Sequence, residues 1–337
     1  MPDPLYITLT NEYRQRLIDR EQSFQRDMAR RWLAIERQLN NDFIELAELA
    51  NQQYEQSGKF SREDLYQLNR YTALLAQLRQ QLIRFNILSE SQVNQLVIDA
   101  VLDGLSNPIE LINAVAAANL FFDRLGIEAA ENIAAVARAS QPLNTILARN
   151  YPLTVNAITD QLLTGVAAGY NPRKIANNII KNGLSQGLNH ILLVARDQAN
   201  RAYREASRQQ YQQSGLVTSY IRIAAKQPGR TSKQPGRTCL ACLALDGTEY
   251  ATDDFMAVHP QDRCAMIPVV RRYPKPTFPA GEVYFNSLDT NIQRQWMGEA
   301  RYELWKAGQF QFKDMAKIHQ NDTWGPSVQV RPVKELV

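Results

Sequence analysis

A chain of 337 residues exceeds the usual size of one domain, so its length predicts two domains or one domain with extensions. A composition of 45% hydrophobic and 21% charged residues is typical of a globular protein with a sizeable core, which excludes a disordered chain. The sequence has no uncharged apolar run of about 18 residues and no basic, apolar leader at its start. We therefore expect a soluble protein made in the cytoplasm, with no membrane span and no signal peptide.

The first part of the chain has the periodicity of long helices. Residues 10–56 contain neither Gly nor Pro, and their apolar residues recur mostly at three- and four-residue spacing, as on one stripe of an amphipathic helix. Ser61 and Asp64 form a capping box that opens a second helix to about residue 85. These helices are expected to form a long N-terminal arm whose stripe packs within the chain rather than on partner helices.

Shorter helices follow, each with its own start or stop signal. The Ala-rich residues 114–138 are apolar on several faces and are expected to form a buried helical core. The predicted helices are 91–103, 108–124 behind Asn107 and Pro108, two that begin at Pro142 and Pro152, 172–182 closed by Gly183, and 186–213.

After Gly215 the pattern changes. Residues 216–225 alternate and are rich in β-branched and aromatic residues, which predicts a strand. Helical patterns return at 288–297, 299–307 and 312–319. The predicted fold is therefore mainly α with a small C-terminal α+β zinc-binding module. Its predicted domains are a helical arm and bundle (1–150), a module that ends in a Cys/His cluster (151–270) and a helical tail (271–337).

The chemistry of the chain is concentrated in one short segment. All three cysteines and one of the three histidines fall within 26 residues, as C-x2-C-x16-H-x4-C. Zinc prefers four tetrahedral thiolate or imidazole ligands, and a C-x2-C turn supplies two of them. Binding of the ion would also help to fold a segment that is too short for its own core. The predicted metal ligands are Cys239, Cys242, His259 and Cys264.

Two other states of the cysteines stay open. One is a disulfide with one cysteine left over, and the other is three unligated thiols in a core. A catalytic zinc site is not indicated, because the segment lacks the glutamate of H-x-E or H-E-x-x-H, and no phosphate-binding Gly-rich loop or G-x-S-x-G is present. We therefore expect a structural metal and no enzymatic activity.

Positive charge is concentrated before the cysteines. Residues 201–238 hold eight Lys or Arg and one acidic residue, Glu205. Such a stretch attracts polyanions, although a solvated helix end with a loop would have the same composition. The predicted nucleic-acid-binding residues are Arg222, Lys226, Arg230, Lys233 and Arg237.

A repeated hexapeptide lies inside this basic stretch. KQPGRT occurs at 226–231 and again at 233–238, directly before Cys239. One copy is interpreted as an insertion by duplication, since loops tolerate added residues at little cost. Its Pro and Gly keep the preceding strand from being extended.

The segment TCLACLALDGTEYATDDFMAVHPQDRCAMIPVV (238–270) resembles the phage head morphogenesis family, the Mu F-like minor head proteins. The resemblance covers about 172–337 and is specific at 238–270. The matching positions are Cys239, Cys242, Asp246-Gly247, His259-Pro260, Arg263-Cys264 and Pro268-Val269. Asp262 stands where the family usually has a cysteine, so Asp262 or His259 would complete the metal site.

The resemblance implies a minor structural protein of a tailed-phage head. Such a protein would associate with the portal and other capsid proteins, with its long helices docked on them. It would lie in the capsid interior of the virion near the packaged DNA and act in head assembly and in DNA retention or ejection. Its basic stretch would face phosphates without reading sequence. The alternatives are a nucleic-acid-processing or toxin-like enzyme carrying the same zinc module and a zinc-containing DNA-binding regulator.

Overall fold

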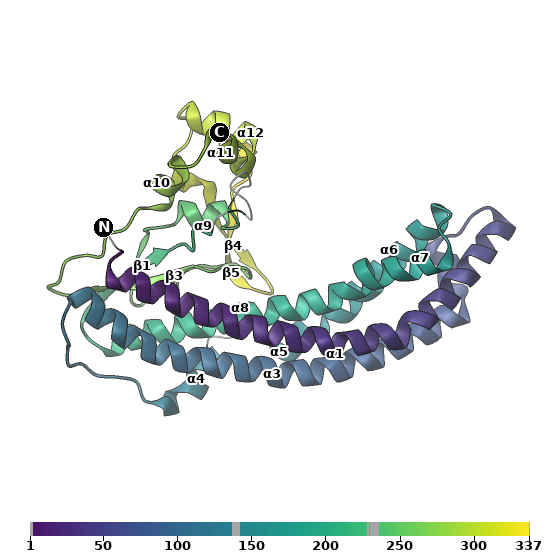
Figure 1. The fold of residues 1–337 in the computed structure, drawn as a ribbon, viewed down its shortest axis with the longest axis horizontal. Helices are drawn as coiled ribbons and strands as arrows, with labels where there is room; N and C mark the ends of the chain where they lie inside the picture. The colour runs from purple at the N-terminus through teal and green to yellow at the C-terminus, as the bar shows by residue number, and fades with distance from the viewer. Residues whose placement is uncertain (1–2, 137–141, 228, 230–235, 337) are drawn as a thin grey trace. The chain divides into compact units, whose positions relative to one another are not determined.

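The computed structural model describes residues 3–136, 142–227, 229 and 236–336. The described chain is mainly helical, and its strands all follow residue 216 in small antiparallel sheets (Figure 1). This confirms the mainly α fold class with a small C-terminal α+β region. None of the helices in the described ranges is long and apolar enough to cross a membrane.

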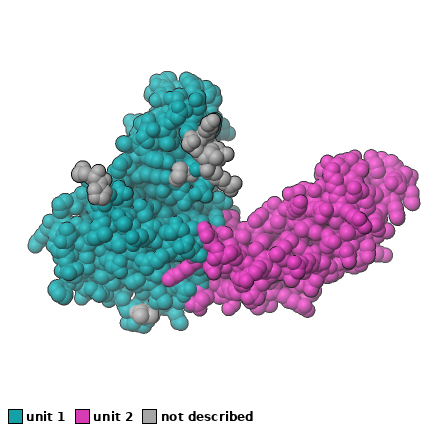
Figure 2. Space-filling model, viewed as in Figure 1, with its two compact units in different colours: residues 1–19, 96–140, 196–337 teal, residues 20–95, 141–195 magenta. Residues whose placement is uncertain are grey.

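The chain divides into two compact units, shown in different colours in Figure 2. Unit 1 comprises residues 1–19, 96–140 and 196–337, and unit 2 comprises residues 20–95 and 141–195. These units differ from the predicted division at 150 and 270, because the start of the first long helix belongs with the C-terminal third of the chain.

Unit 2 is built from helices. It contains α2 (Arg62–Gln67), α5 (Leu143–Ala148), α6 (Asn150–Ala167), α7 (Pro172–Asn178) and parts of α1 (Leu5–Ser57), α3 (Asn69–Ala116) and α8 (Ser185–Gln213). The predicted helix 10–56 and the capping box of Ser61 and Asp64 are confirmed. The apolar stripe of α1, with Trp32, Leu39 and Phe43, is buried within the chain, so this stripe is not a free docking face.

Several predicted helix boundaries are wrong. The helix expected to end at about 85 and those expected at 91–103 and 108–124 are replaced by one helix, α3, that ends at Ala116, and Pro152 lies inside α6. A new helix was expected at Pro108, but Pro108 lies inside α3. Proline removes one helical hydrogen bond at a cost of about 3 kcal/mol, and burial of Leu105, Leu111 and Ile112 offsets that cost. Gly183 does not end a helix either, because it lies in a π-helical segment, Ile179–Leu184, that continues into α8.

The Ala-rich stretch 114–138, expected to be a buried helical core, is neither one helix nor wholly buried, since Phe121 is 99% exposed. Helix α3 ends at Ala116, where Ala117 takes a positive φ of 50° and Asn113 accepts a hydrogen bond from the amide of Leu120. A short 3-10 turn (Ile127–Ala129) and α4 (Ala130–Val136) follow. Residues 137 and 138 lie outside the described residues.

The main sheet of unit 1 has the order β2-β1-β3, and both pairings are antiparallel. Strand β1 (Val217–Ile223) confirms the predicted strand and lies between β2 (Glu249–Ala251) and β3 (Ala265–Val270). Helix α9 (Leu240–Ala244) lies between β1 and β2 in the chain, and all five of its residues are buried. This arrangement places the end of β1, the start of α9 and the start of β3 around one point.

The C-terminal tail is mixed and not wholly helical. Helices α10 (Gly281–Asn286), α11 (Thr290–Met297) and α12 (Glu299–Lys306) precede two short 3-10 turns, Phe312–Met315 and Val333–Glu335. The helix predicted at 312–319 is wrong, because β4 (Ala316–Asn321) pairs there with β5 (Gly325–Val330). This hairpin also contacts the loop before His259, since the amide of Val328 donates to the carbonyl of Val258 at 3.0 Å.

Candidate metal centre

The predicted ligands come from three neighbouring positions in unit 1. Cys239 precedes α9 and Cys242 lies inside it. His259 and Cys264 belong to the loop that leads into β3, and Cys264 directly precedes that strand. Strand β3 pairs with β1 along its whole length, and Ala265, directly after Cys264, lies opposite Ile223 at the end of β1. The loop that carries His259 and Cys264 therefore lies near the start of α9.

The ligand atoms gather in two overlapping groups. Cys239, Cys242 and His259 have their Sγ and ring nitrogen atoms within 4.8 Å of one another, and so do the ligand atoms of Cys242, Asp262 and Cys264. The His259 Nε2 atom lies 3.1 Å from Cys242 Sγ. These five residues are therefore placed close enough to hold a metal ion, and Cys242 is common to both groups.

Asp262 is engaged by arginines. Its Oδ1 accepts from Arg204 at 3.0 Å, and its Oδ2 accepts from Arg222 at 2.9 Å. The backbone amide of Cys264 also donates to Oδ1 at 2.5 Å. The Asp262 side chain is only 1% exposed. Both oxygens thus have donors already, and Asp262 would have to leave a buried guanidinium to bind a metal.

Arg222 lies among the thiols. Its guanidinium is 3.4 Å from Cys242 Sγ and 3.3 Å from Cys264 Sγ, and it donates to the carbonyl of Ala257 at 2.7 Å. Burial alone would lower the pKa of Arg222, but Cys264, Asp262 and Cys242 hold it well above its usual value. A permanently charged group therefore stabilises negative charge on the sulfur atoms.

The thiols are electrostatically unequal. A hydrogen bond from Cys242 lowers the pKa of Cys239; burial opposes this effect, and His259 adds to it, which brings the pKa to about 4. The pKa of Cys242 is raised well above its usual value, first by its hydrogen bonds with Cys239 and Cys264. Cys239, the half-buried member of the cluster, is thus the thiol most ready to lose its proton.

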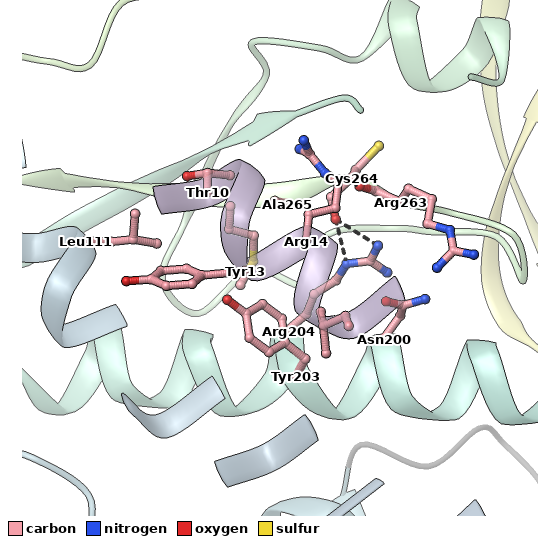
Figure 3. Close-up of a pocket in the computed structure, with 12 residues that line it drawn as sticks. Thr10, Tyr13, Arg14, Leu111, Asn200, Tyr203, Arg204, Arg263, Cys264 and Ala265 are labelled. Atoms are coloured by element: carbon pink, nitrogen blue, oxygen red, sulfur yellow. Dashed lines mark hydrogen bonds between the residues drawn. The ribbon is translucent and has the colours of Figure 1, made fainter. Parts of the chain in front are cut away.

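Arg204, which also pairs with Asp262, and Arg14 hold the loop that carries Cys264. Arg204 donates to the carbonyl of Cys264 from Nε at 3.1 Å and from a terminal nitrogen at 2.8 Å (Figure 3). Arg14, from the first turns of α1, donates to the carbonyl of Arg263 at 2.9 Å. The two arginines line a cavity of about 20 Å³ behind the loop. The backbone around Cys264 is therefore fixed by side chains from two helices.

The turn after α9 is fixed as well. Asp246 Oδ1 accepts from the amide of Ala224 at 2.6 Å, and Lys226 forms an ion pair with Asp246 at 2.7 Å. Gly247 has a φ of 86°, a conformation that favours glycine, and its amide donates to the carbonyl of Arg222. This turn joins the end of β1 to the end of α9.

The donor set fits zinc. Three thiols and one imidazole are ligands that zinc accepts in structural sites, and they come from the C-x2-C turn and the following loop as predicted. The three cysteines are free thiols in the structure, so the disulfide alternative is not the state described here. Soft sulfur ligands would make the bound metal a structural cross-link between α9 and the loop before β3.

The predicted nucleic-acid-binding residues are scattered by the fold. Arg222 was expected to face phosphates, but it is 0% exposed and belongs to the thiol cluster, so that assignment is wrong. Lys226 pairs with Asp246 and also donates to the carbonyl of Pro279 at 2.6 Å. Arg237 is exposed. Arg230 and Lys233 lie outside the described residues.

Other basic residues of the stretch are also used internally. Arg201 pairs with Asp197 at 2.8 Å, and Arg208 pairs with Glu205 at 2.6 Å. Arg201 and Arg204 are each 5% exposed. The sequence contains the acidic partners, but Asp197 and Asp262 lie outside the 201–238 window, so a count within the window overstates the free charge.

Comparisons of the chain with protein-family models, with curated proteins and with solved structures find no match.

Proposed function

We propose that this chain is a minor structural protein of a tailed-phage head, associated with the portal and located inside the capsid near the packaged DNA. The resemblance at 238–270 motivates the proposal. Its principal structural support is that the three cysteines, His259 and Asp262 of that motif lie together in unit 1, in two overlapping groups of possible ligands. Cys239, Cys242, His259 and Cys264 supply ligand atoms, and Asp246-Gly247 builds the turn that joins β1 to α9.

In this proposal the cluster holds one structural zinc ion. Cys239, Cys242, His259 and Cys264 would bind it, and Asp262 would remain the partner of Arg204 and Arg222. Bound zinc would cross-link α9 to the loop before β3. The chain's own contribution is the arginine network, which holds the loop in place and offsets the charge of the thiolates.

The partner surface lies outside the buried stripe of α1. Exposed apolar side chains on α1 and α3 include Leu5, Leu33, Leu49, Ile83 and Ile87. We propose that contact with portal or capsid proteins uses some of these exposed side chains. The stripe with Trp32 and Phe43 is already covered by the chain itself.

The location is tested in particles made by cells that carry the gene. The expected result is that mass spectrometry of purified heads finds this chain at a lower copy number than the major capsid protein. It should also be protected from added protease until the heads are opened. Detection only in the unassembled fraction would refute the proposal, and a Cys239→Ser/Cys242→Ser variant tests whether the metal cluster is needed for incorporation.

A further inference from the structure

A polar hollow of about 470 Å³ lies beside the thiol cluster. The four predicted zinc ligands form part of its lining, and three arginines form another part. Arg196 comes from α8, Arg237 lies two residues before Cys239, and Arg263 precedes Cys264. The volume is within the range of about 300–1,000 Å³ of small-molecule sites, while so polar a lining fits a charged ligand.

The charge of the hollow is positive. Of the described residues that line it, Asp262 carries the one carboxylate, and both of its oxygens accept hydrogen bonds from the buried Arg204 and Arg222. Amide and hydroxyl groups of Gln227, Thr238 and Gln261 complete the polar lining. Apart from the thiols of the cluster, two of which lie beside the Arg222 guanidinium, an anion that entered the hollow would therefore meet arginines and neutral donors.

The backbone near Arg237, at the edge of the hollow, is held by several contacts. The Arg237 amide donates to the carbonyl of Gln227 at 3.1 Å. Gly236 lies against Trp296, because a Cβ added there would come within 2.1 Å of the indole ring. The Trp296 indole N–H donates to the carbonyl of Thr238 at 3.2 Å. The backbone on both sides of Arg237 is thus held in place while its side chain is exposed.

We propose that this hollow binds a phosphate group and that Arg237, Arg263 and Arg196 hold it. The planar guanidinium donates two parallel hydrogen bonds, which matches phosphate oxygens better than the point charge of a lysine does. The phosphate belongs to the backbone of a nucleic acid; only this choice of source rests on the proposed function. The interaction reads no bases, because the arginines would contact the backbone alone.

The test measures binding of a fluorescein-labelled 15-nucleotide oligo-dT to the full-length, zinc-loaded protein over a range of salt concentrations. For single-stranded nucleic acid, each phosphate contact contributes about 0.7 to the steepness of a plot of log affinity against log salt concentration. Loss of one contact should therefore weaken binding about eightfold at 50 mM salt. Arg237→Gln should show this loss. Arg84→Gln, an equal charge change at an exposed position of α3 in unit 2, should bind as the wild type does. Equal binding by the wild type and both variants would overturn the proposal.

A second arm identifies the source of the phosphate. Pyrophosphate is titrated against the wild type and Arg237→Gln, and the melting temperature is followed. Stabilisation by pyrophosphate that Arg237→Gln abolishes, without oligonucleotide binding, would assign the hollow to a free phosphate compound and overturn the nucleic-acid source. Absence of both kinds of binding would overturn the site itself. Since neither arm uses phage particles, failure here is distinguishable from failure to find the chain in heads.

Discussion

Asp262 connects the arginines to the thiols. It accepts from Arg204 with one oxygen and from Arg222 with the other, and Arg222 continues to Cys242 and Cys264. Burial raises the pKa of this carboxyl, but Arg204 and Arg222 outweigh burial and hold it well below its usual range. Asp262 therefore stays charged and serves as the counter-ion of two buried cations.

Asp262→Asn tests this role. Removing one partner of a buried ion pair costs about 3–5 kcal/mol of unfolding free energy, because the other charge is left uncompensated. We expect a loss of this size in urea unfolding with zinc present. Asp253→Asn, at an exposed position of the same unit, should change stability little. The variant should still bind one zinc ion, and loss of the ion with unchanged stability would make Asp262 a ligand.

The ligand set is tested by metal content. Purified protein should contain about one zinc ion per chain, because three thiols and one imidazole lie in two overlapping groups that share Cys242. Cobalt in place of zinc should give a thiolate charge-transfer absorption. His259→Ala should weaken zinc binding in a chelator competition, whereas Gln261→Ala, two residues away and exposed, should not. A chain without zinc, or equal affinities of the two variants, would contradict the assignment.

Close contact between α3 and α8 depends on one glycine. A Cβ at Gly104 would lie 2.5 Å from the carbonyl oxygen of Tyr203 and 2.7 Å from the Cβ of Ala206. Backbone atoms cannot move aside as the end of a side chain does, so the two helices would have to separate here.

Gly104→Ala should therefore destabilise the protein although alanine favours helix. Overpacking of this kind costs about 1–3 kcal/mol, more than the gain of about 1 kcal/mol from helix propensity. Thermal unfolding by circular dichroism measures the change. Ser106→Ala, at an exposed position of the same helix, should stay within about 0.5 kcal/mol of the wild type. A stabilised Gly104→Ala would show that the helices adapt freely.

Elements with strong local signals could be predicted, and those that depend on distant partners could not. Helix α1 and the cap at Ser61 follow from spacing and residue type within a few residues. Strand β4 has few apolar residues and forms by pairing with β5. The gathering of the cysteines and His259 was expected from spacing. The burial of Arg222 was not, because it depends on Asp262, forty residues along the chain.

At the scale of the whole molecule, unit 1 is assembled from both ends of the chain. Ile7 and Tyr13 of α1 are buried, and Tyr6 donates through its hydroxyl to the carbonyl of Thr277 at 3.0 Å. Arg14 completes this attachment at the carbonyl of Arg263, next to Cys264. The thiol cluster is thus supported by residues outside the segment 239–264 that contains its cysteines and His259.

Removal of residues 1–19 should therefore weaken the metal cluster. The expected results are a lower melting temperature and faster transfer of zinc to a chromophoric chelator, since the Cys264 loop loses one of its two arginine supports. Arg14→Met should show a smaller change in the same direction. Arg30→Met, whose side chain is 76% exposed, is the matched control. Unchanged zinc transfer in the truncated chain would contradict the coupling.

The fold does not depend on the number of KQPGRT copies before Cys239, because residues near the two ends of the repeated segment are hydrogen-bonded to each other. The Gln227 carbonyl accepts from the amide of Arg237, and the Gln227 amide donates to the Thr238 hydroxyl, so these two ends of the repeated segment are held together. If residues 226–232 are deleted, Lys233 and Gln234 inherit the positions of Lys226 and Gln227. Gln234 and Arg237 are then three residues apart, with Pro-Gly between them in the order that a type II turn requires. Closing a loop of four residues instead of eleven costs about 0.9 kcal/mol less in chain entropy, so the shortened chain should be as stable as the parent or slightly more stable.

A gene that gains or loses this 21-nucleotide unit by replication slippage would therefore still encode a folded protein.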